Sequence, residues 1–151
     1  MENSNGNAYT DIKPALSVVE VGFPERNRRV IVVEDDQSVV RMLRFSLRRA
    51  GFEVVEVATG GDALRFLDDQ PTEAVVLDLG LPDGREGAVL DWLHQHQQMN
   101  SSSPAWVVIS ALDLEEATRR YGPLGSHFLA KPFDPWELVR MLEELLSAKE
   151  V

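Results

Sequence analysis

The sequence predicts an α/β fold, a doubly wound five-stranded parallel sheet with helices on both faces. Two observations support it. Four apolar runs of strand length end in polar or charged groups, at Glu34, Asp78, Ser110 and Lys131. From Arg28 onward, strand and helix patterns alternate five times. Continuous apolar strands are typical of parallel sheets that helices cover on both sides.

The first half of the pattern contains two strands and two helices. The strand after Arg28 is followed by apolar residues at helical spacing, and Gly51 is placed to end that helix. A second strand, residues 52–57, is more polar, which favours a place near a sheet edge. Thr59 then caps a short helix that ends at about Asp69.

The second half repeats this alternation. The strand that ends at Asp78 is followed by a helix around residues 89–93, and the strand 105–110 is followed by a short helix that ends at about residue 121. Asp113 and Glu116 have the spacing of a capping box for that short helix. After the strand that begins at Phe128, Asp134 caps the last helix.

Five such units favour the strand order 2-1-3-4-5, as in flavodoxin-like folds, in which the first and third strands are neighbours. The carboxyl ends of parallel strands lie at one edge of the sheet, where sites form in this class of fold. We therefore expect Glu34, Asp35, Asp78, Ser110 and Lys131 to share one edge.

Composition limits the classes of function. The 151 residues include no cysteine, which excludes disulfides and thiol catalysis and is in keeping with a cytoplasmic protein. A net charge of −10 disfavours direct binding to nucleic acid or to an anionic membrane. We find neither a secretory signal nor an apolar stretch of membrane-spanning length.

The domain organisation is predicted to be simple. Residues 1–27 are predicted to form an irregular extension that is disordered in the isolated protein, and an extra strand or a docking segment is the alternative for its apolar piece, residues 15–23. Residues 28–151 form one domain, and we expect no effector domain in this chain.

The acidic residues at this edge predict a metal site with phosphoryl chemistry. Glu34, Asp35 and Asp78 would repel one another without a cation, and oxygen ligands favour Mg²⁺, with Mn²⁺ as the alternative. A carboxylate can accept a phosphoryl group as a nucleophile. Lys131 would then supply a charge for one phosphoryl oxygen, and Ser110 a hydroxyl donor for another.

Four motifs carry a resemblance to the receiver domains of bacterial two-component response regulators. They are Val-Val-Glu-Asp-Asp at 32–36, Leu-Asp-Leu-Gly-Leu-Pro-Asp-Gly at 77–84, Ile-Ser-Ala at 109–111 and Leu-Ala-Lys-Pro-Phe at 129–133. They occur in the family's order and at closely similar spacing, and the resemblance extends from about Arg28 to Ala148.

The resemblance implies a phosphorylation-activated switch rather than an enzyme with an external substrate. Asp78 would accept the phosphoryl group from a histidine kinase or a histidine phosphotransfer protein. Glu34, Asp35, Asp78 and the backbone carbonyl of Gly80 would hold Mg²⁺. Ser110 and Phe128 would be the switch residues, which change the face of the fourth helix, fifth strand and fifth helix. The remaining implied properties are a downstream effector protein as partner, and a monomer or a weak, phosphorylation-dependent dimer.

The chain departs from the family pattern at several positions. Glu34 stands where many members have Asp, and Phe128 replaces the more frequent Tyr, so that the switch loses a hydroxyl. Gly80 and Leu112 offer no polar side chain to position a hydrolytic water. We therefore predict slow autodephosphorylation.

Three other functions remain open from the sequence: a docking module that is not phosphorylated, a phosphohydrolase with Asp78 as nucleophile, and flavin electron transfer, which the acidic loop after the first strand disfavours. His94 and His96 could suggest a metal site, but residues two apart on a helix do not face each other. We interpret both as solvated residues near a helix end.

Overall fold

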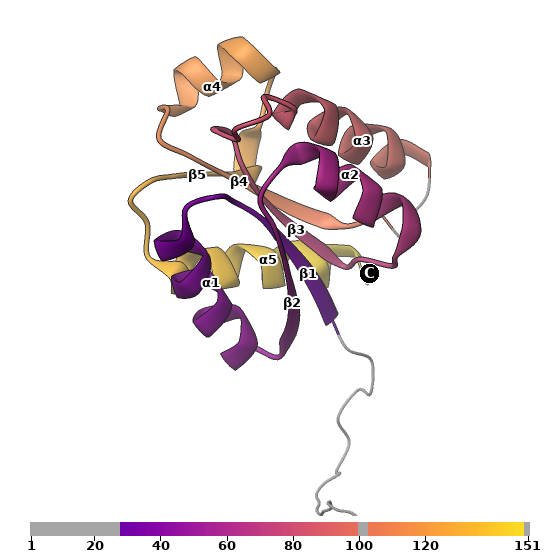
Figure 1. The fold of residues 1–151 in the computed structure, drawn as a ribbon, viewed down its shortest axis with the longest axis vertical. Coiled ribbons are helices and arrows are strands. Elements are labelled where there is room, and N and C mark those ends of the chain that lie inside the picture. The colour runs from indigo at the N-terminus through magenta and orange to yellow at the C-terminus, as the bar shows by residue number, and fades with distance from the viewer. Residues whose placement is uncertain (1–27, 100–102, 150–151) are drawn as a thin grey trace, which may run out of the picture.

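The computed structural model describes residues 28–99 and 103–149. They form one five-stranded parallel sheet with helices on both sides (Figure 1). The strands are β1 (Arg28–Val33), β2 (Phe52–Val57), β3 (Ala74–Asp78), β4 (Ala105–Ser110) and β5 (Phe128–Ala130). Their order is β2-β1-β3-β4-β5, which confirms the predicted fold and the place of the more polar β2 at an edge. The predicted N-terminal extension lies outside the described residues.

Five helices connect and follow the strands: α1 (Gln37–Arg49), α2 (Gly60–Asp69), α3 (Glu86–Met99), α4 (Leu114–Tyr121) and α5 (Pro135–Lys149), with a short 3-10 helix, η2 (Gly125–His127), before β5. Local sequence sets where they begin. The side chains of Asp36, Thr59 and Asp113 accept hydrogen bonds from backbone N–H groups in the first turns of α1, α2 and α4. Asp134 does the same for Trp136 at the start of α5.

The core consists of two apolar layers, one on each face of the sheet. Val30 and Val32 of β1 pack with α1 and α5, whereas Ile31 and Val33 of the same strand pack with α2 and α3. Ala117 of α4 belongs to the second layer. These four residues of β1 are fully buried, as expected for a strand that is covered on both faces.

The strand register brings the polar strand ends together. Val33 pairs with Leu77, so Glu34 follows β1 beside Asp78, the last residue of β3. On the other side of Asp78, Ser110 ends β4 and pairs with Ala130, after which Lys131 follows. Lys131 and Pro132 are joined by a cis peptide bond. One edge of the sheet thus holds all the strand-end residues singled out by the sequence.

None of the helices within residues 28–99 and 103–149 combines the length and the apolarity needed to cross a membrane.

Candidate functional site

Three carboxylates meet at the carboxyl edge of the sheet. Ligand oxygens of Glu34, Asp35 and Asp78 all lie within 4.8 Å of one another. Asp78 and Glu34 are buried, with relative exposures of 4% and 2%, whereas Asp35 is exposed. A buried group of like charges is unfavourable unless a cation compensates it. A positive charge is therefore needed to stabilise these carboxylates in their ionised form.

Lys131 supplies part of that charge. Its Nζ donates a hydrogen bond to Glu34 Oε1 at 2.9 Å and lies 3.3 Å from Asp78 Oδ1. Burial raises the pKa of Glu34, against the lowering effect of the Lys131 hydrogen bond and of the Asp36 N–H, which also donates to this carboxylate. Burial by itself would lower the pKa of Lys131, but the hydrogen bond to Glu34 and the charge of Asp78 outweigh it, and the pKa is raised. Lys131 therefore carries its charge between two buried carboxylates.

Of the other predicted site residues, Gly80 and Ser110 lie at the same pocket as Asp78, whereas Phe128 is at the start of β5 and does not line that pocket. Ser110 is buried, and its Oγ accepts a hydrogen bond of 2.9 Å from the N–H of Leu112. Phe128 is half-buried against the core layer that contains α2, α3 and Ala117. A Cβ placed on Gly80 would lie 3.8 and 3.9 Å from the two carboxylate oxygens of Asp78. A side chain at position 80 would thus face the carboxylate directly.

A pocket of about 460 Å³ opens over these residues. Its lining comprises Glu34, Asp35, Asp36, Asp78, Leu79, Gly80, Ser110, Ala111, Leu112, Arg120 and Lys131. Arg120, from the last turn of α4, was not predicted as part of the site. Tyr121, the next residue, is half-buried, and burial together with the charges of Glu86 and Asp78 raises the pKa of its phenol. The end of α4 therefore lies beside the acidic cluster.

The loop between β3 and α3, which contains Gly80, is tied to its neighbours by two carboxylates. Asp83 accepts hydrogen bonds from the backbone N–H groups of Gly60 and Gly61 at the start of α2, at 3.1 and 2.9 Å. Buried Glu86 accepts one of 2.7 Å from the N–H of Leu81. Glycine is required at position 60, because a Cβ there would lie 2.8 Å from that of Arg85.

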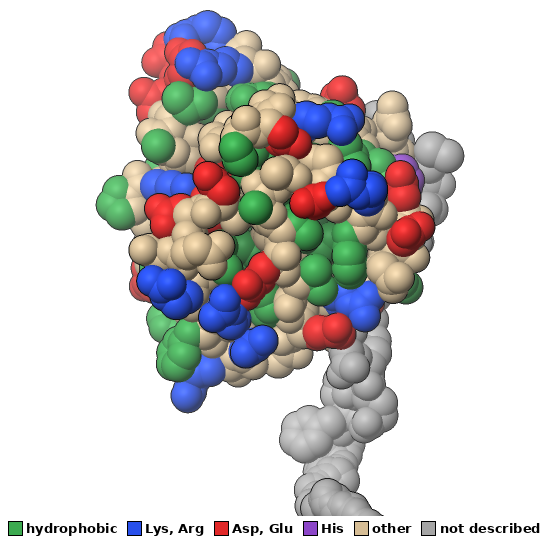
Figure 2. Space-filling view, viewed as in Figure 1, with side chains coloured by type: hydrophobic (Ala, Val, Ile, Leu, Met, Phe, Trp, Pro, Cys, Tyr) green, Lys and Arg blue, Asp and Glu red, His purple; other side chains and the backbone are tan. Residues whose placement is uncertain are grey.

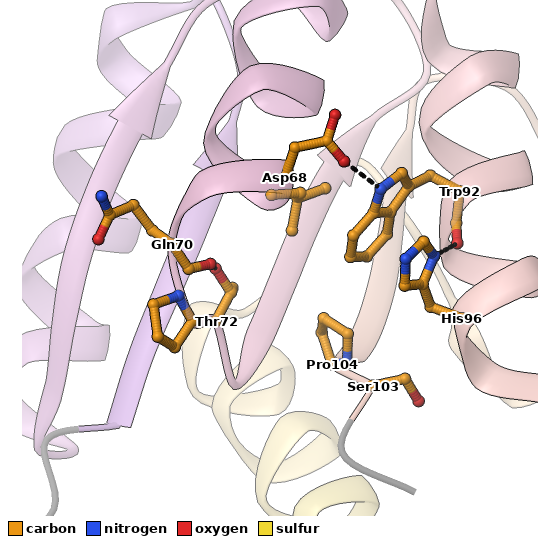
Figure 3. Close-up of a pocket in the computed structure, with 9 residues that line it drawn as sticks. Asp68, Gln70, Thr72, Trp92, His96, Ser103 and Pro104 are labelled. Atoms are coloured by element: carbon orange, nitrogen blue, oxygen red, sulfur yellow. Dashed lines mark hydrogen bonds between the residues drawn. The ribbon is translucent and has the colours of Figure 1, made fainter. Parts of the chain in front are cut away.

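A second pocket, of about 230 Å³, lies at the opposite, amino-terminal end of the strands and is drawn in Figure 3. The Trp92 indole N–H donates to Asp68 across it, and His96 stacks on the Trp92 ring at a centroid distance of 3.7 Å. His94 packs edge-on against Trp106. The interpretation of His94 and His96 as solvated is therefore wrong, because both rings are half-buried against tryptophans.

Comparison with known proteins shows the family. The family model of the response regulator receiver domain matches residues 30–143, and the chain belongs to this family. It is 33% identical over 121 residues to the transcriptional regulatory protein GltR of Pseudomonas aeruginosa, covering 79% of this chain and 49% of GltR. It is 31% identical over 129 residues to the alkaline phosphatase synthesis transcriptional regulatory protein PhoP of Bacillus subtilis, covering 83% of this chain and 51% of PhoP. The chain thus spans about half the length of these relatives.

Solved structures show the same fold. A CheY-like response regulator receiver domain protein from Methanospirillum hungatei has a TM-score of 0.68 at 22% identity, over 83% of this chain and 98% of that one. The receiver domain of the Francisella response regulator 1452 has a TM-score of 0.67 at 24% identity, over 81% and 98%. The family and the fold agree with the sequence-based expectation, and membership implies phosphorylation-dependent signalling.

Proposed function

We propose that Asp78 accepts a phosphoryl group from a phosphohistidine of a histidine kinase or a histidine phosphotransfer protein. The observation that carries this proposal is the buried Asp78 carboxylate, grouped with Glu34 and Asp35 and 3.3 Å from the Lys131 ammonium. The proposed result is a signalling switch in the cytoplasm that acts on a downstream effector protein.

The reaction is a transfer between two nucleophiles. An Oδ of Asp78 forms a bond to phosphorus as the P–N bond of the phosphohistidine breaks, and the electron pair returns to the imidazole nitrogen, which takes up a proton. Such transfers depend mainly on positioning and on neutralised charge. Lys131 would pair with one phosphoryl oxygen, and Ser110 would leave the Leu112 N–H to donate its hydroxyl to another.

The donor set fits a magnesium ion. Glu34, Asp35 and Asp78 offer only oxygen atoms, and the exposed position of Asp35 leaves room for water, as Mg²⁺ prefers. With the Gly80 carbonyl, these residues would hold the ion, which would offset the negative charge of the carboxylates and the phosphoryl oxygens. Glu34 would have to share its carboxylate between the ion and Lys131.

Ser110 and Phe128 are proposed to carry the signal outward. The shift of the Ser110 hydroxyl toward the phosphoryl group would vacate space beside β4, into which the Phe128 ring would turn. Phe128 is half-buried in this structure, so an inward turn would bury more of its ring. The exposed face of α4, β5 and α5 would change as a result.

The experiment is incubation with Mg²⁺ and acetyl phosphate, followed by intact mass measurement. We expect one labile adduct of the mass of a phosphoryl group, which is absent when Mg²⁺ is chelated and absent in Asp78→Asn. Asp91→Asn, at an exposed position of α3 outside the pocket lining, serves as the control and should still be labelled. Labelling that survives in Asp78→Asn would assign the phosphoryl group to another residue, and no labelling of the wild type would leave the docking-module alternative.

A further inference from the structure

The last turn of α4 places a second basic residue, Arg120, at the pocket of about 460 Å³ that contains Asp78. Arg120 and Lys131 are the basic residues that line this pocket, and the acidic residues in the same lining are Glu34, Asp35, Asp36 and Asp78. An aspartyl phosphate carries more negative charge than the carboxylate from which it forms. A guanidinium at this pocket would therefore stabilise the phosphorylated form of Asp78 more than the unphosphorylated form.

The position of Arg120 follows from the shortness of α4. The helix has eight residues and ends at Tyr121, before Gly122, whose φ of 87° is in the region that favours glycine. A helix this short stays close to the carboxyl edge of the sheet from which it starts. Tyr121 independently indicates the same placement, since its phenol lies near enough to Asp78 and Glu86 to be affected by their charges.

In this structure the guanidinium is held by a weak partner. Arg120 Nε donates to Glu116 Oε2 at 2.8 Å, one helical turn earlier, and the Arg120 side chain is 55% exposed. Exposed pairs of this kind contribute little to stability. Glu116 is also paired with Arg119, so it would keep a partner if Arg120 moved away. Figure 2 shows basic and acidic side chains side by side over α4, at the top of the view.

We propose that Arg120 is a phosphoryl-binding residue, which exchanges its ion pair with Glu116 for the phosphoryl group on Asp78. This inference rests on the proposed phosphorylation of Asp78. The planar guanidinium can donate two parallel hydrogen bonds to phosphoryl oxygens, where Lys131 acts as a point charge. The exchange would connect the phosphoryl group to α4 directly, by a route separate from Phe128.

The neighbouring residue provides a matched control. Arg119 is on the same helix, is 62% exposed and also pairs with Glu116, but it lies outside the described residues that line the pocket. The probe is beryllofluoride, a phosphoryl mimic that binds to carboxylates, titrated by calorimetry in Mg²⁺. We expect Arg120→Gln to weaken its binding about fivefold, as for the loss of one exposed charge pair, and Arg119→Gln to leave it unchanged. Glu116→Gln, which frees Arg120, should tighten it.

Magnesium alone separates a phosphoryl-binding role from a structural one. Loss of a positive charge near the carboxylates should leave Mg²⁺ binding equal or slightly tighter in Arg120→Gln, whereas a damaged site would bind both Mg²⁺ and beryllofluoride more weakly. Arg120→Lys should recover part of the beryllofluoride affinity. Equal effects of Arg120→Gln and Arg119→Gln would overturn the inference alone. Failure of the wild type to bind beryllofluoride would overturn it together with the proposed function.

Discussion

At the scale of single residues, the Lys131 ammonium is the positive charge that holds the buried carboxylates together. Glu34 and Lys131 come from opposite ends of the domain's sequence, yet their hydrogen bond of 2.9 Å is at the centre of the site. Removing the cation leaves Glu34 and Asp78 with less compensation, which is costly for buried charges.

Lys131→Met tests that compensation. Without Mg²⁺ we expect the free energy of unfolding to fall by about 1–3 kcal/mol, because a buried carboxylate loses its hydrogen-bond donor. Added Mg²⁺ should stabilise the variant more than it stabilises the wild type, because the ion would then bind carboxylates that no ammonium neutralises. Urea unfolding with and without Mg²⁺ measures both. An unchanged stability in the absence of Mg²⁺ would show that Lys131 does not compensate Glu34.

Gly80 is a second residue whose identity has a measurable consequence. Its missing side chain would point at the Asp78 carboxylate from less than 4 Å, where an amide could position a hydrolytic water. We expect Gly80→Asn to shorten the lifetime of the phosphorylated protein on the order of tenfold. The loss of the mass adduct over time measures it.

Gly87→Asn is the matched control for position 80. Gly87 is in the first turn of α3, and no described atom lies within 4 Å of a Cβ placed there. Its substitution should leave the phosphate lifetime unchanged. If both variants lose the phosphoryl group at the rate of the wild type, the slow hydrolysis expected for this chain does not depend on the absence of a side chain at position 80.

At the scale of elements, the attachment of the β3–α3 loop to α2 sets the position of Gly80. Gly60→Ala would bring a methyl group within 3 Å of the Arg85 Cβ and carbonyl oxygen, so the loop must shift. We expect a loss of about 1–3 kcal/mol in stability, as for other overpacked positions, and weaker Mg²⁺ binding. Gly61→Ala is the control, because its contacts are at 3.5 Å and alanine favours a helix. Similar Mg²⁺ affinities for the two variants would contradict this role of the loop.

The hydrogen bonds from the start of α2 to the Asp83 carboxylate should make the stability of the protein depend on pH. The N–H of Gly61, with those of Gly60 and Arg85, lowers the pKa of Asp83 below its ordinary value of 3.8. A lowered pKa in the folded state contributes stability that is complete above the ordinary value and is lost as the pH falls through the lower one. The difference in unfolding free energy between the wild type and Asp83→Asn should therefore be constant at neutral pH and shrink below about pH 4. A difference that stays constant down to pH 3 would argue against the attachment.

Local and topological features of the fold could be predicted from the sequence. Thr59 and Asp113 cap helices as expected, because capping depends on neighbours three residues away. The grouping of Asp78 with Glu34 and Asp35 was predictable because parallel strands end at one edge of the sheet. These inferences needed only chain order and residue type.

Features that depend on tertiary packing were missed. Arg120 reaches the pocket because of the direction that α4 takes from the sheet, and helix periodicity does not contain that direction. Asp83 binds N–H groups more than twenty residues away. One local feature was also missed: Glu116 was expected to complete a capping box, but its carboxylate pairs with Arg119 and Arg120, three and four residues later on the same helix. His96 was misjudged because stacking on Trp92 covers part of its ring.

At the scale of the whole molecule, the carboxyl ends of the strands are the proposed input and the α4–β5–α5 face is the proposed output. Two connections would join them, Ser110 with Phe128 on one side and Arg120 on the other. Both would begin at the proposed phosphoryl group on Asp78. The chemical identity of the phosphorylated residue is thus the claim on which the rest depends.

Reduction with borohydride tests that claim most directly, because it converts an aspartyl phosphate into homoserine at the modified position. After phosphorylation in Mg²⁺, fragmentation mass spectrometry of the reduced protein should find homoserine at position 78 and unmodified acids at positions 34, 35 and 36. Homoserine at another acidic position, or at none, would contradict the account.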